Sequence, residues 1–502
     1  MNWQLHSTFW QRCPSLWYAL FFLLGIAWEK THHLGLFVPF LLLCLIGFLF
    51  PDSSRWMRLF LGISSLIFGS LFFCSIYLLP ERESSGKVLF SLDQATAATS
   101  VFHKEMWKCR GRLHWMRRED GSLQAKNLPI LLIFPRQKDP PQLGHLYHAF
   151  GTISEKKSTY FLKIESKTQW QLYKKRPLYA ACLCLREQCK KSLETFFTKD
   201  HSESLSFLRG ILTGEFSSRK MTAEFNRVGL QHIMAISGFH FSLIATLLSS
   251  IFGFFFSPRP LSLILICLLT LYFFFIGWFA SVQRAWIMQL CALIAPLFAR
   301  ERNRWNSFGI ALWGTLLYEP LFCMQIGFQF SFLITASLLL LYSPIDQFLD
   351  LFWQLRSLEQ MRQNPKYEQV AYLLLIVFRR SLAITLAAHF LSIPLSLHHF
   401  HAFPLLSFLY SLFFPPLVFL FVCCFFVSLV LFPLSSQFLN AIQWVMGKML
   451  LLIYNTPLEL HIVYYSSNYS SWLLLLCFSL LFFLMTTLRK KQSLLFTPSW
   501  IP

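Results

Sequence analysis

The sequence predicts a polytopic α-helical membrane protein of about twelve spans, give or take two, with a small all-β external domain inserted after the third span. Two compositional observations carry the membrane prediction: 55% of the 502 residues are hydrophobic, and only 14% are charged. Soluble domains carry roughly 25% charged residues. A third observation, the polar stretch 81–228 between apolar runs, predicts the inserted domain.

The apolar runs define the expected spans, because a spanning helix needs ~20 mostly apolar residues. The candidates are 14–28, 34–50, 58–79, 229–256, 261–280, 283–299, 305–322, 326–342, 372–396, 403–432, 436–454 and 471–488. The first run is not followed by a cleavage-site pattern, so we expect a retained helix. Pro415-Pro416 is a point at which 403–432 could break into two half-segments.

Basic residues in the short loops predict the orientation, since Lys and Arg accumulate on the cytosolic side. Every second short loop is rich in them, whereas the opposite short loops hold only Lys30 and, near a span end, Arg284. This bias predicts that both termini lie in the cytosol. Residues 81–228 then lie outside, in a periplasm or its equivalent.

The polar stretch divides into a β-rich part and a helical part. Strand-like runs fall at 88–92, 106–115, 130–134, 145–153 and 160–165, with turn signals between them. Five such runs suggest a small barrel, for which the OB-fold is a candidate. The expected domains are therefore 1–80 (three spans), 81–178 (basic β domain), 179–228 (amphipathic helical connector), 229–488 (transmembrane domain) and 489–502 (cytosolic basic tail).

The expected β domain is strongly basic. Residues 81–178 hold 18 Lys and Arg against 9 Asp and Glu, a balance of +9 within the chain's +20. A basic surface with interleaved aromatic rings suits a single-stranded nucleic acid. A solvated basic surface, or one attracted to anionic lipid headgroups, accounts for the same charge. The candidate DNA contacts are Trp107, Lys108, Arg110, Arg112, Trp115, Arg117 and Arg118.

The apolar run that begins at Gly229 carries polar groups near its start: His232, Ser237 and His240, with Gly238 between them. Polar groups in hydrocarbon need a partner or water, and Gly in a membrane helix favours a break or a close helix contact. His232 and His240 would share a broad face of a straight helix. They either contact a phosphate or water in a pathway or fix the packing of helices.

Later spans carry further polar candidates: Gln283, Arg284, Gln325, Gln329 and Ser331. Arg284 could bind a phosphate bidentately, reach lipid headgroups or pair with Glu319. Gln325 and Gln329 are four residues apart and would share a helix face, where they either line a path or join helices.

No catalytic or metal-binding motif is evident. The sequence holds no H-E-x-x-H, G-x-S-x-G or P-loop motif and no paired C-x-x-C. We therefore expect no enzyme activity, no metal and no cofactor. Two alternatives stay open: a metal contact at the cluster His389, His398, His399 and His401, and a disulfide from Cys109 to Cys182, Cys184 or Cys189.

Four blocks in order resemble the ComEC competence-protein family, the inner-membrane channels for DNA uptake in naturally transformable bacteria. Leu208 to Glu215 resembles the family's Leu-Leu-x-Gly-(Asp/Glu) lead-in, and Phe225 to His240 resembles its Gly-Leu-x-His and Ala-Ile-Ser-Gly-x-His signature. Residues 280–288 resemble a third block. Glu319-Pro320 followed by 327–332 resembles a fourth.

Two departures from the family's pattern matter. Many members end in a metallo-β-lactamase-like domain with a His-x-Asp-x-Asp-His type signature, and this sequence contains no such cluster. Strand degradation would then come from another protein. Tyr410-Ser411 ahead of Pro415-Pro416 also stands where the family usually shows an Asn, which puts the polar character of that span in question.

The resemblance implies a channel that passes DNA, as a single strand, from periplasm to cytosol during natural transformation. It implies DNA and the lipid bilayer as partners, together with an external DNA receptor, a separate nuclease and a cytosolic ATPase; a homo-oligomer is left open. The alternative is a polytopic transporter or flippase for an anionic lipid or small solute. A membrane scaffold that transports nothing is a third option.

Overall fold

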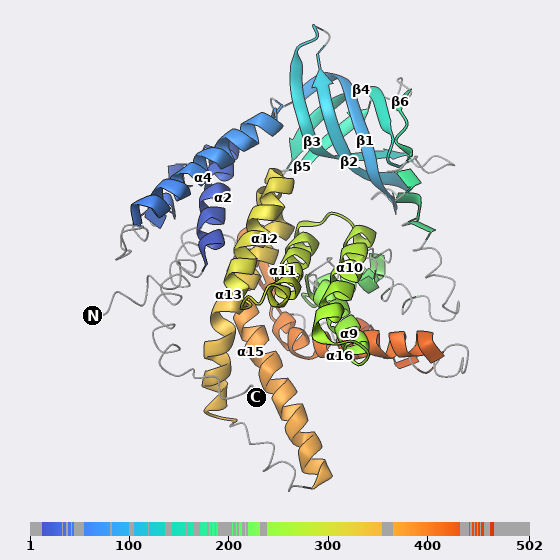
Figure 1. Cartoon of the computed structure of the whole chain (residues 1–502). Coiled ribbons are helices and arrows are strands. Elements are labelled where there is room, and N and C mark those ends of the chain that lie inside the picture. The colour runs from blue at the N-terminus through green and yellow to red at the C-terminus, as the bar shows by residue number, and fades with distance from the viewer. Residues whose placement is uncertain are drawn as a thin grey trace. The chain divides into compact units, whose positions relative to one another are not determined.

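The fold is that of a computed structural model, shown in Figure 1. It describes residues 13–32, 55–80, 83–99, 105–118, 120–135, 143–156, 159–164, 171–177, 219–230, 238–353, 365–431 and 462–465, with isolated shorter stretches within 34–44, 180–188, 203–216 and 441–455. The chain divides into two compact units. The barrel unit comprises residues 21–45 and 57–196, and the helical unit comprises 1–20, 46–56 and 197–502.

Two N-terminal helices, α2 (Pro14–Thr31) and α4 (Arg55–Ile76), pack closely against each other. A Cβ on Gly25 would overlap the backbone of Leu66, and a Cβ on Gly69 would lie 3.1 Å from the ring of Phe22. Small residues at such contacts allow two helix backbones to approach. These helices correspond to the predicted spans 14–28 and 58–79, whereas most of 34–50 lies outside the described residues.

Six strands form the barrel: β1 (Glu83–Thr99), β2 (Glu105–Arg117), β3 (Leu123–Pro135), β4 (Leu146–Lys156), β5 (Thr159–Ile164) and β6 (Gln171–Lys174). Their order is β1-β2-β3-β5-β4, and β4 pairs again with β1, which closes the ring (Figure 1). Strands β3 and β5 are parallel, and the other pairs are antiparallel. The prediction of a small barrel is confirmed.

The barrel interior is filled by apolar side chains that alternate along the strands. They include Val88, Phe90, Leu92, Leu113, Met116, Leu128, Leu132, Ile153 and Leu162. Cys109 also points inward and is 0% exposed, and burial raises the pKa of its thiol to about 12. Cys109 and Cys184 are both free thiols, so the disulfide between them, left open above, does not form. Cys182 and Cys189 lie outside the described residues.

The helical unit holds α7 (Arg219–Arg227), α9 (Gly238–Gly253), α10 (Pro258–Ile276), α11 (Ala280–Leu297), α12 (Arg304–Tyr318), η3 (Pro320–Met324), α13 (Ile326–Asp350), α15 (Lys366–Phe400), α16 (Leu406–Leu431) and the hairpin of β7 (Ala402–Pro404) with β8 (Val463–Tyr465). Rings of Phe225 in α7 and Phe414 in α16 meet at 5.6 Å in a buried apolar cluster of this unit. That contact joins the segment before α9 to a helix almost 200 residues further along the chain.

Four helices in the described part of the chain are long and apolar enough to cross a membrane: Trp56–Ile76, Pro258–Ile276, Ile326–Asp350 and Lys366–Phe400. They correspond to the predicted spans 58–79, 261–280, 326–342 and 372–396. The count of about twelve stays a prediction, since 471–488 and most of 436–454 lie outside the described residues.

One predicted span differs from the structure. The run 229–256 does not begin as a helix, because Gly229 adopts φ 79° and ends α7; α9 is described from Gly238, and 231–237 lie outside the described residues. The amide of Leu230 donates to the carbonyl of Phe225, and that of Gly229 donates to Asn226, a C-terminal capping pattern that needs a left-handed residue. The predicted span 403–432 corresponds to the single helix α16, which continues through Pro415-Pro416 without the possible break.

Candidate functional site

The turn at Gly229 rests on the start of α16. A Cβ on Gly229 would lie 2.5 Å from Cβ of Ser407 and 2.6 Å from Cγ of Pro404, so only glycine fits. Ser407 is buried, and its Oγ lies 3.4 Å from Nε2 of His389. Nδ1 of His389 donates to the carbonyl of Thr385 at 2.9 Å, which leaves Nε2 to accept from the hydroxyl. His389 is therefore an interior packing residue.

Arg284 is the central polar residue of the helical unit. Its Nε donates to Oγ of Ser331 in α13 at 2.8 Å, and its Nη1 lies 3.9 Å from Sδ of Met288. A Cβ on Gly238, the first residue of α9, would overlap Nη2 of Arg284. Arg284 contacts no carboxylate among the described residues, so it does not pair with Glu319.

A second contact lies within the same turn of α13. Nε2 of Gln329 donates to the carbonyl of Cys323 in η3 at 3.1 Å, and Nε2 of His399 donates to Oε1 of Gln329 at 2.8 Å. The rings of His398 and His399 lie 5.0 Å apart. This contact ties the start of α13 to η3 and to the end of α15. The two contacts, centred on Ser331 and Gln329, form the first polar layer of the unit.

The other pathway candidates do not join this layer. Gln283 is 2% exposed, and its Oε1 has no hydrogen-bond partner among the described residues. Gln325 is exposed at the N-cap of α13 and precedes the helix. The expectation that it shares a helix face with Gln329 is therefore wrong. His232 and Ser237 lie outside the described residues; the backbone of His240 is in the first turn of α9, and its side chain is not described.

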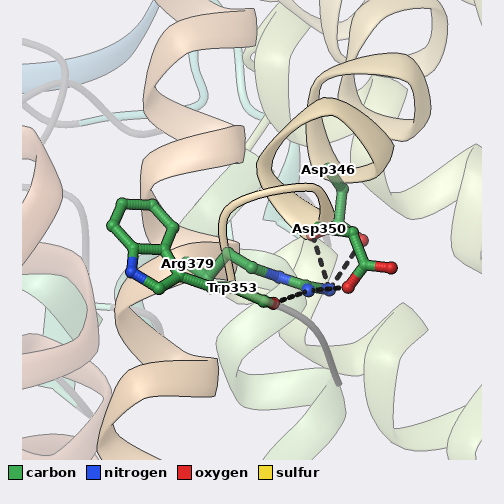
Figure 2. Close-up of polar contacts among 4 residues, drawn as sticks. All are labelled: Asp346, Asp350, Trp353 and Arg379. Atoms are coloured by element: carbon green, nitrogen blue, oxygen red, sulfur yellow. Dashed lines mark hydrogen bonds and ion pairs between the residues drawn. The ribbon is translucent and has the colours of Figure 1, made fainter.

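A second polar layer, missed from the sequence, joins α13 to α15 at Arg379 (Figure 2). The Arg379 side chain is 3% exposed and donates to Asp350, to Asp346 and to the carbonyl of Trp353 at 2.9 Å. On the sequence alone, Arg379 stands near the start of the predicted span 372–396 and counts only as one of the basic residues on the cytosolic side. Two Asp four residues apart, at the end of an apolar run, were the signal that could have revealed the layer.

The two polar layers are separated by about one hydrocarbon thickness. Gln329 and Asp350 are about 20 residues apart on α13, as are Arg379 and His399 on α15, and each separation is roughly 30 Å at ~1.5 Å per residue. The hydrocarbon core of a bilayer is about 30 Å thick. Because both layers join α13 to α15, the spacing is the same on the two helices, and mostly apolar residues lie between the layers.

On the barrel, the structure brings together only some of the candidate DNA contacts. The guanidinium of Arg117 lies over the ring of Trp115, 5.1 Å from its centre. Arg112 donates to Oδ1 of Asn127 at 3.3 Å. Arg110 and Arg118 are exposed, Trp107 is partly buried, and the side chain of Lys108 is not described.

The environment of His114 in β2 shows that positive charges gather on this part of the barrel. Burial, together with the charges of Arg176 and Arg112, lowers the pKa of His114 to about 4. Its Nε2 lies 3.2 Å from Oγ of Ser91. Cations from β2 and from the segment after β6 therefore converge on one region of the barrel unit.

Comparisons with known proteins single out the helical unit. The model of a family described as Competence protein matches residues 213–491, more than half of the chain. ComE operon protein 3 of Bacillus subtilis (strain 168) is 24% identical over 208 residues, which are 41% of this chain and 24% of that protein. The match thus spans about a quarter of the relative's length. No solved structure gives a significant match.

Proposed function

The chain belongs to the Competence protein family, and on that premise we propose that it is an inner-membrane channel that passes single-stranded DNA from periplasm to cytosol. The family supports a role in DNA uptake, and the apolar helices indicate a membrane protein. The matched range 213–491 contains both polar layers. The barrel precedes it, so its part in the proposal rests on its own structure.

The environment of Arg284 carries the proposal. Ionisable side chains among apolar helices are costly and tend to mark transport pathways. Within the described residues, the guanidinium contacts a hydroxyl and a thioether and has no carboxylate to balance its charge. A phosphodiester can supply that charge, and the planar guanidinium can bind it through two hydrogen bonds. The Ser331 contact holds the side chain in position for this.

The distribution of charge supports the direction of transport. Arg259 is exposed in the first turn of α10, and Arg300 and Arg302 are exposed just after α11, at the opposite helix ends from Arg284. Lys and Arg in short loops favour the cytosolic side. Arg284 and the first polar layer would then face the periplasm, and the Arg379 layer would lie near the cytosolic interface.

The barrel supports the receiving step. A five-strand ring closed between β1 and β4 is compatible with an OB-like domain, a fold that often binds single strands. Its basic surface suits a phosphate backbone. We further propose that the chain itself does no covalent chemistry. Its partners would then be an external DNA receptor, a separate nuclease and a cytosolic ATPase.

Uptake of labelled DNA into the cytosol tests the proposal. In a transformable host that lacks its own copy of the gene, wild type should restore uptake. Arg284→Ala should not, although it reaches the membrane in equal amount. Arg259→Ala, which removes an exposed arginine at the other end of the helices, is the matched control and should restore uptake.

Three outcomes would count against the proposal. Full uptake with Arg284→Ala would show that this residue is not needed in the pathway. Normal uptake in the deletion host would show that the protein is not needed for DNA transport. If wild type restores no uptake but moves a labelled anionic lipid between the leaflets of vesicles, the lipid transporter is the better description.

A further inference from the structure

A row of side chains crosses four strands on the outer face of the barrel. The ring of Trp115 in β2 lies 5.2 Å from the ring of His148 in β4, with their planes 61° apart. The ring of His148 lies 4.6 Å from that of Tyr173 in β6, with their planes 80° apart. Arg117 covers the Trp115 ring. We call Arg117, Trp115, His148 and Tyr173 the cross-strand row.

The strand pairing explains why these rings meet. Leu89 of β1 stands directly opposite Trp115 on one side and His148 on the other. Successive side chains of a strand point to opposite faces, so Leu89 points outward when Val88 and Phe90 point inward. Leu89 is nevertheless only 7% exposed. The two flanking rings close over it and make one continuous surface across three strands.

We propose that the cross-strand row is a stacking platform for the bases of single-stranded DNA. This inference rests on the proposed function and assigns its receiving step to one face of the barrel. Tyr173 is 60% exposed, on a strand whose residues are all exposed. Every base has a flat face, so a row of rings binds successive bases without demanding a sequence.

The charges around the row favour a nucleic acid as the occupant. Exposed cations lie at both ends of the row: Arg117, its end member, with Arg118 at the end of β2, and Lys174 and Lys175 at the end of β6. Rings in a row with cations at both ends match a single strand that runs along the row, with its bases on the rings and its phosphates near the cations. The mixture of stacking rings and cations also predicts a preference for single strands, since a duplex hides its base faces.

An abasic oligonucleotide provides a sharp test, because it keeps the phosphate charges and lacks the bases. We expect the full-length protein in nanodiscs to bind a fluorescent oligo(dT) more tightly than an abasic oligomer of equal length. Tyr173→Ala should weaken oligo(dT) binding roughly 5- to 100-fold, the range for loss of one stacked base, and leave abasic binding unchanged.

Conservative and control variants separate stacking from other effects. Tyr173→Phe keeps the ring and should bind as wild type does. Trp115→Phe keeps an aromatic ring over Leu89 and should retain most of the affinity. Ile133→Ala, which shortens an exposed apolar side chain of β3 outside the row, should change nothing. Equal oligo(dT) affinity in Tyr173→Ala and wild type would overturn the assignment to this face.

Hydroxyl-radical footprinting distinguishes DNA from lipid as the occupant. Oligo(dT) should protect Trp115 and Tyr173 from oxidation in nanodiscs. If both residues are already protected on transfer from detergent to nanodiscs, and oligo(dT) adds nothing, the row lies on the membrane and the inference is wrong. If the protein binds no oligonucleotide at all, both this inference and the proposed DNA-receiving role of the barrel are wrong. If it binds oligonucleotides at other residues, only the assignment to the cross-strand row is wrong.

Discussion

Ser331 of α13 accepts a hydrogen bond from Nε of Arg284 in α11 at 2.8 Å, and this contact sets the direction of the guanidinium. A hydrogen bond to a charged group is worth ~1.5–3 kcal/mol. We expect Ser331→Ala to lower DNA uptake by roughly tenfold, because Arg284 remains but loses the hydrogen bond that fixes its guanidinium. Ser331→Thr, which keeps a hydroxyl, should retain uptake.

The control for this change lies one turn further along α13. Thr335 bonds only to the carbonyl of Ser331 within its own helix, so Thr335→Ala should leave uptake close to wild type. A similar loss in both alanine variants would mean that α13 is sensitive in general and that the Arg284 contact is not special.

Gly238 and Gly327 give a matched pair at the starts of two helices. A Cβ on Gly238 would overlap Nη2 of Arg284, whereas a Cβ on Gly327 would meet nothing within 4 Å. Gly238→Ala should therefore displace the guanidinium and reduce uptake. Gly327→Ala should be neutral or stabilising by up to ~1 kcal/mol, since Ala favours a helix over Gly.

Uptake and thermal unfolding in detergent measure this pair. The displaced atom is at the end of a flexible side chain, so Gly238→Ala should cost uptake more than stability. Wild-type uptake in Gly238→Ala would show that the position of Arg284 does not matter for transport.

Arg379 and Arg380 are adjacent in α15 but differ in burial. Arg379 is buried against Asp346 and Asp350, whereas Arg380 is exposed. Arg379→Ala leaves two carboxylates near a low-dielectric interior and should destabilise the helical unit by on the order of 2–4 kcal/mol. Arg380→Ala should change the free energy of unfolding by less than about 0.5 kcal/mol.

Thermal unfolding followed by fluorescence compares the two variants. Removing Arg379 leaves the two carboxylates without a counter-charge. Arg379→Met combined with Asp346→Asn and Asp350→Asn removes those charges as well and should recover part of the lost stability. Equal melting temperatures for the Arg379 and Arg380 single variants would show that the second polar layer contributes no stability.

The stability of the barrel should depend on pH through His114. Its pKa is about 4 in the folded barrel, below its ordinary value of ~6.5, so the unfolded chain binds more protons between these values. The stabilisation is present above ~6.5 and is lost as the pH falls toward 4. With screening at a partly exposed site, we expect a loss on the order of 1 kcal/mol between pH 7 and pH 5.

Alkylation of Cys109 in urea reports this opening, because the thiol is fully buried in the folded barrel. His114→Gln removes the titration and should lose less protection at pH 5 than wild type does. The two proteins are compared at the same pH, so the intrinsic reactivity of the thiol cancels. An identical pH dependence in both would exclude His114 as its source.

Alternation and turn signals predict a strand at each of β1 to β5, although the predicted runs 88–92 and 130–134 cover only part of β1 (Glu83–Thr99) and β3 (Leu123–Pro135). Strand β6 was missed because its four residues are all exposed and show no alternation. The pairing that closes the ring joins Ser91 to Leu146, far apart in the sequence. Such a pairing depends on the three-dimensional course of the chain, which local patterns do not carry.

The site was predicted unevenly for similar reasons. Arg284 and Ser331 stand out as polar residues in apolar runs, and the structure joins them. The contacts of Arg379 were missed because its charge was used only to predict topology. Gly229 was read as the start of a span, although its role is to end α7, a role that depends on its backbone conformation.

The closed ring also has a consequence for the order in which the chain can mature. Strand β1 needs β2 and β4 as neighbours, and β4 emerges from the ribosome some 50 residues after β1 ends. The hairpins from β1 to β3 can form as they appear, but one edge of β1 waits for β4. Pairings between distant segments form slowly. The unpaired edge of β1 must be shielded until β4 is available. We therefore expect the supply of a chaperone or export factor that shields it to limit how much functional protein a cell can make.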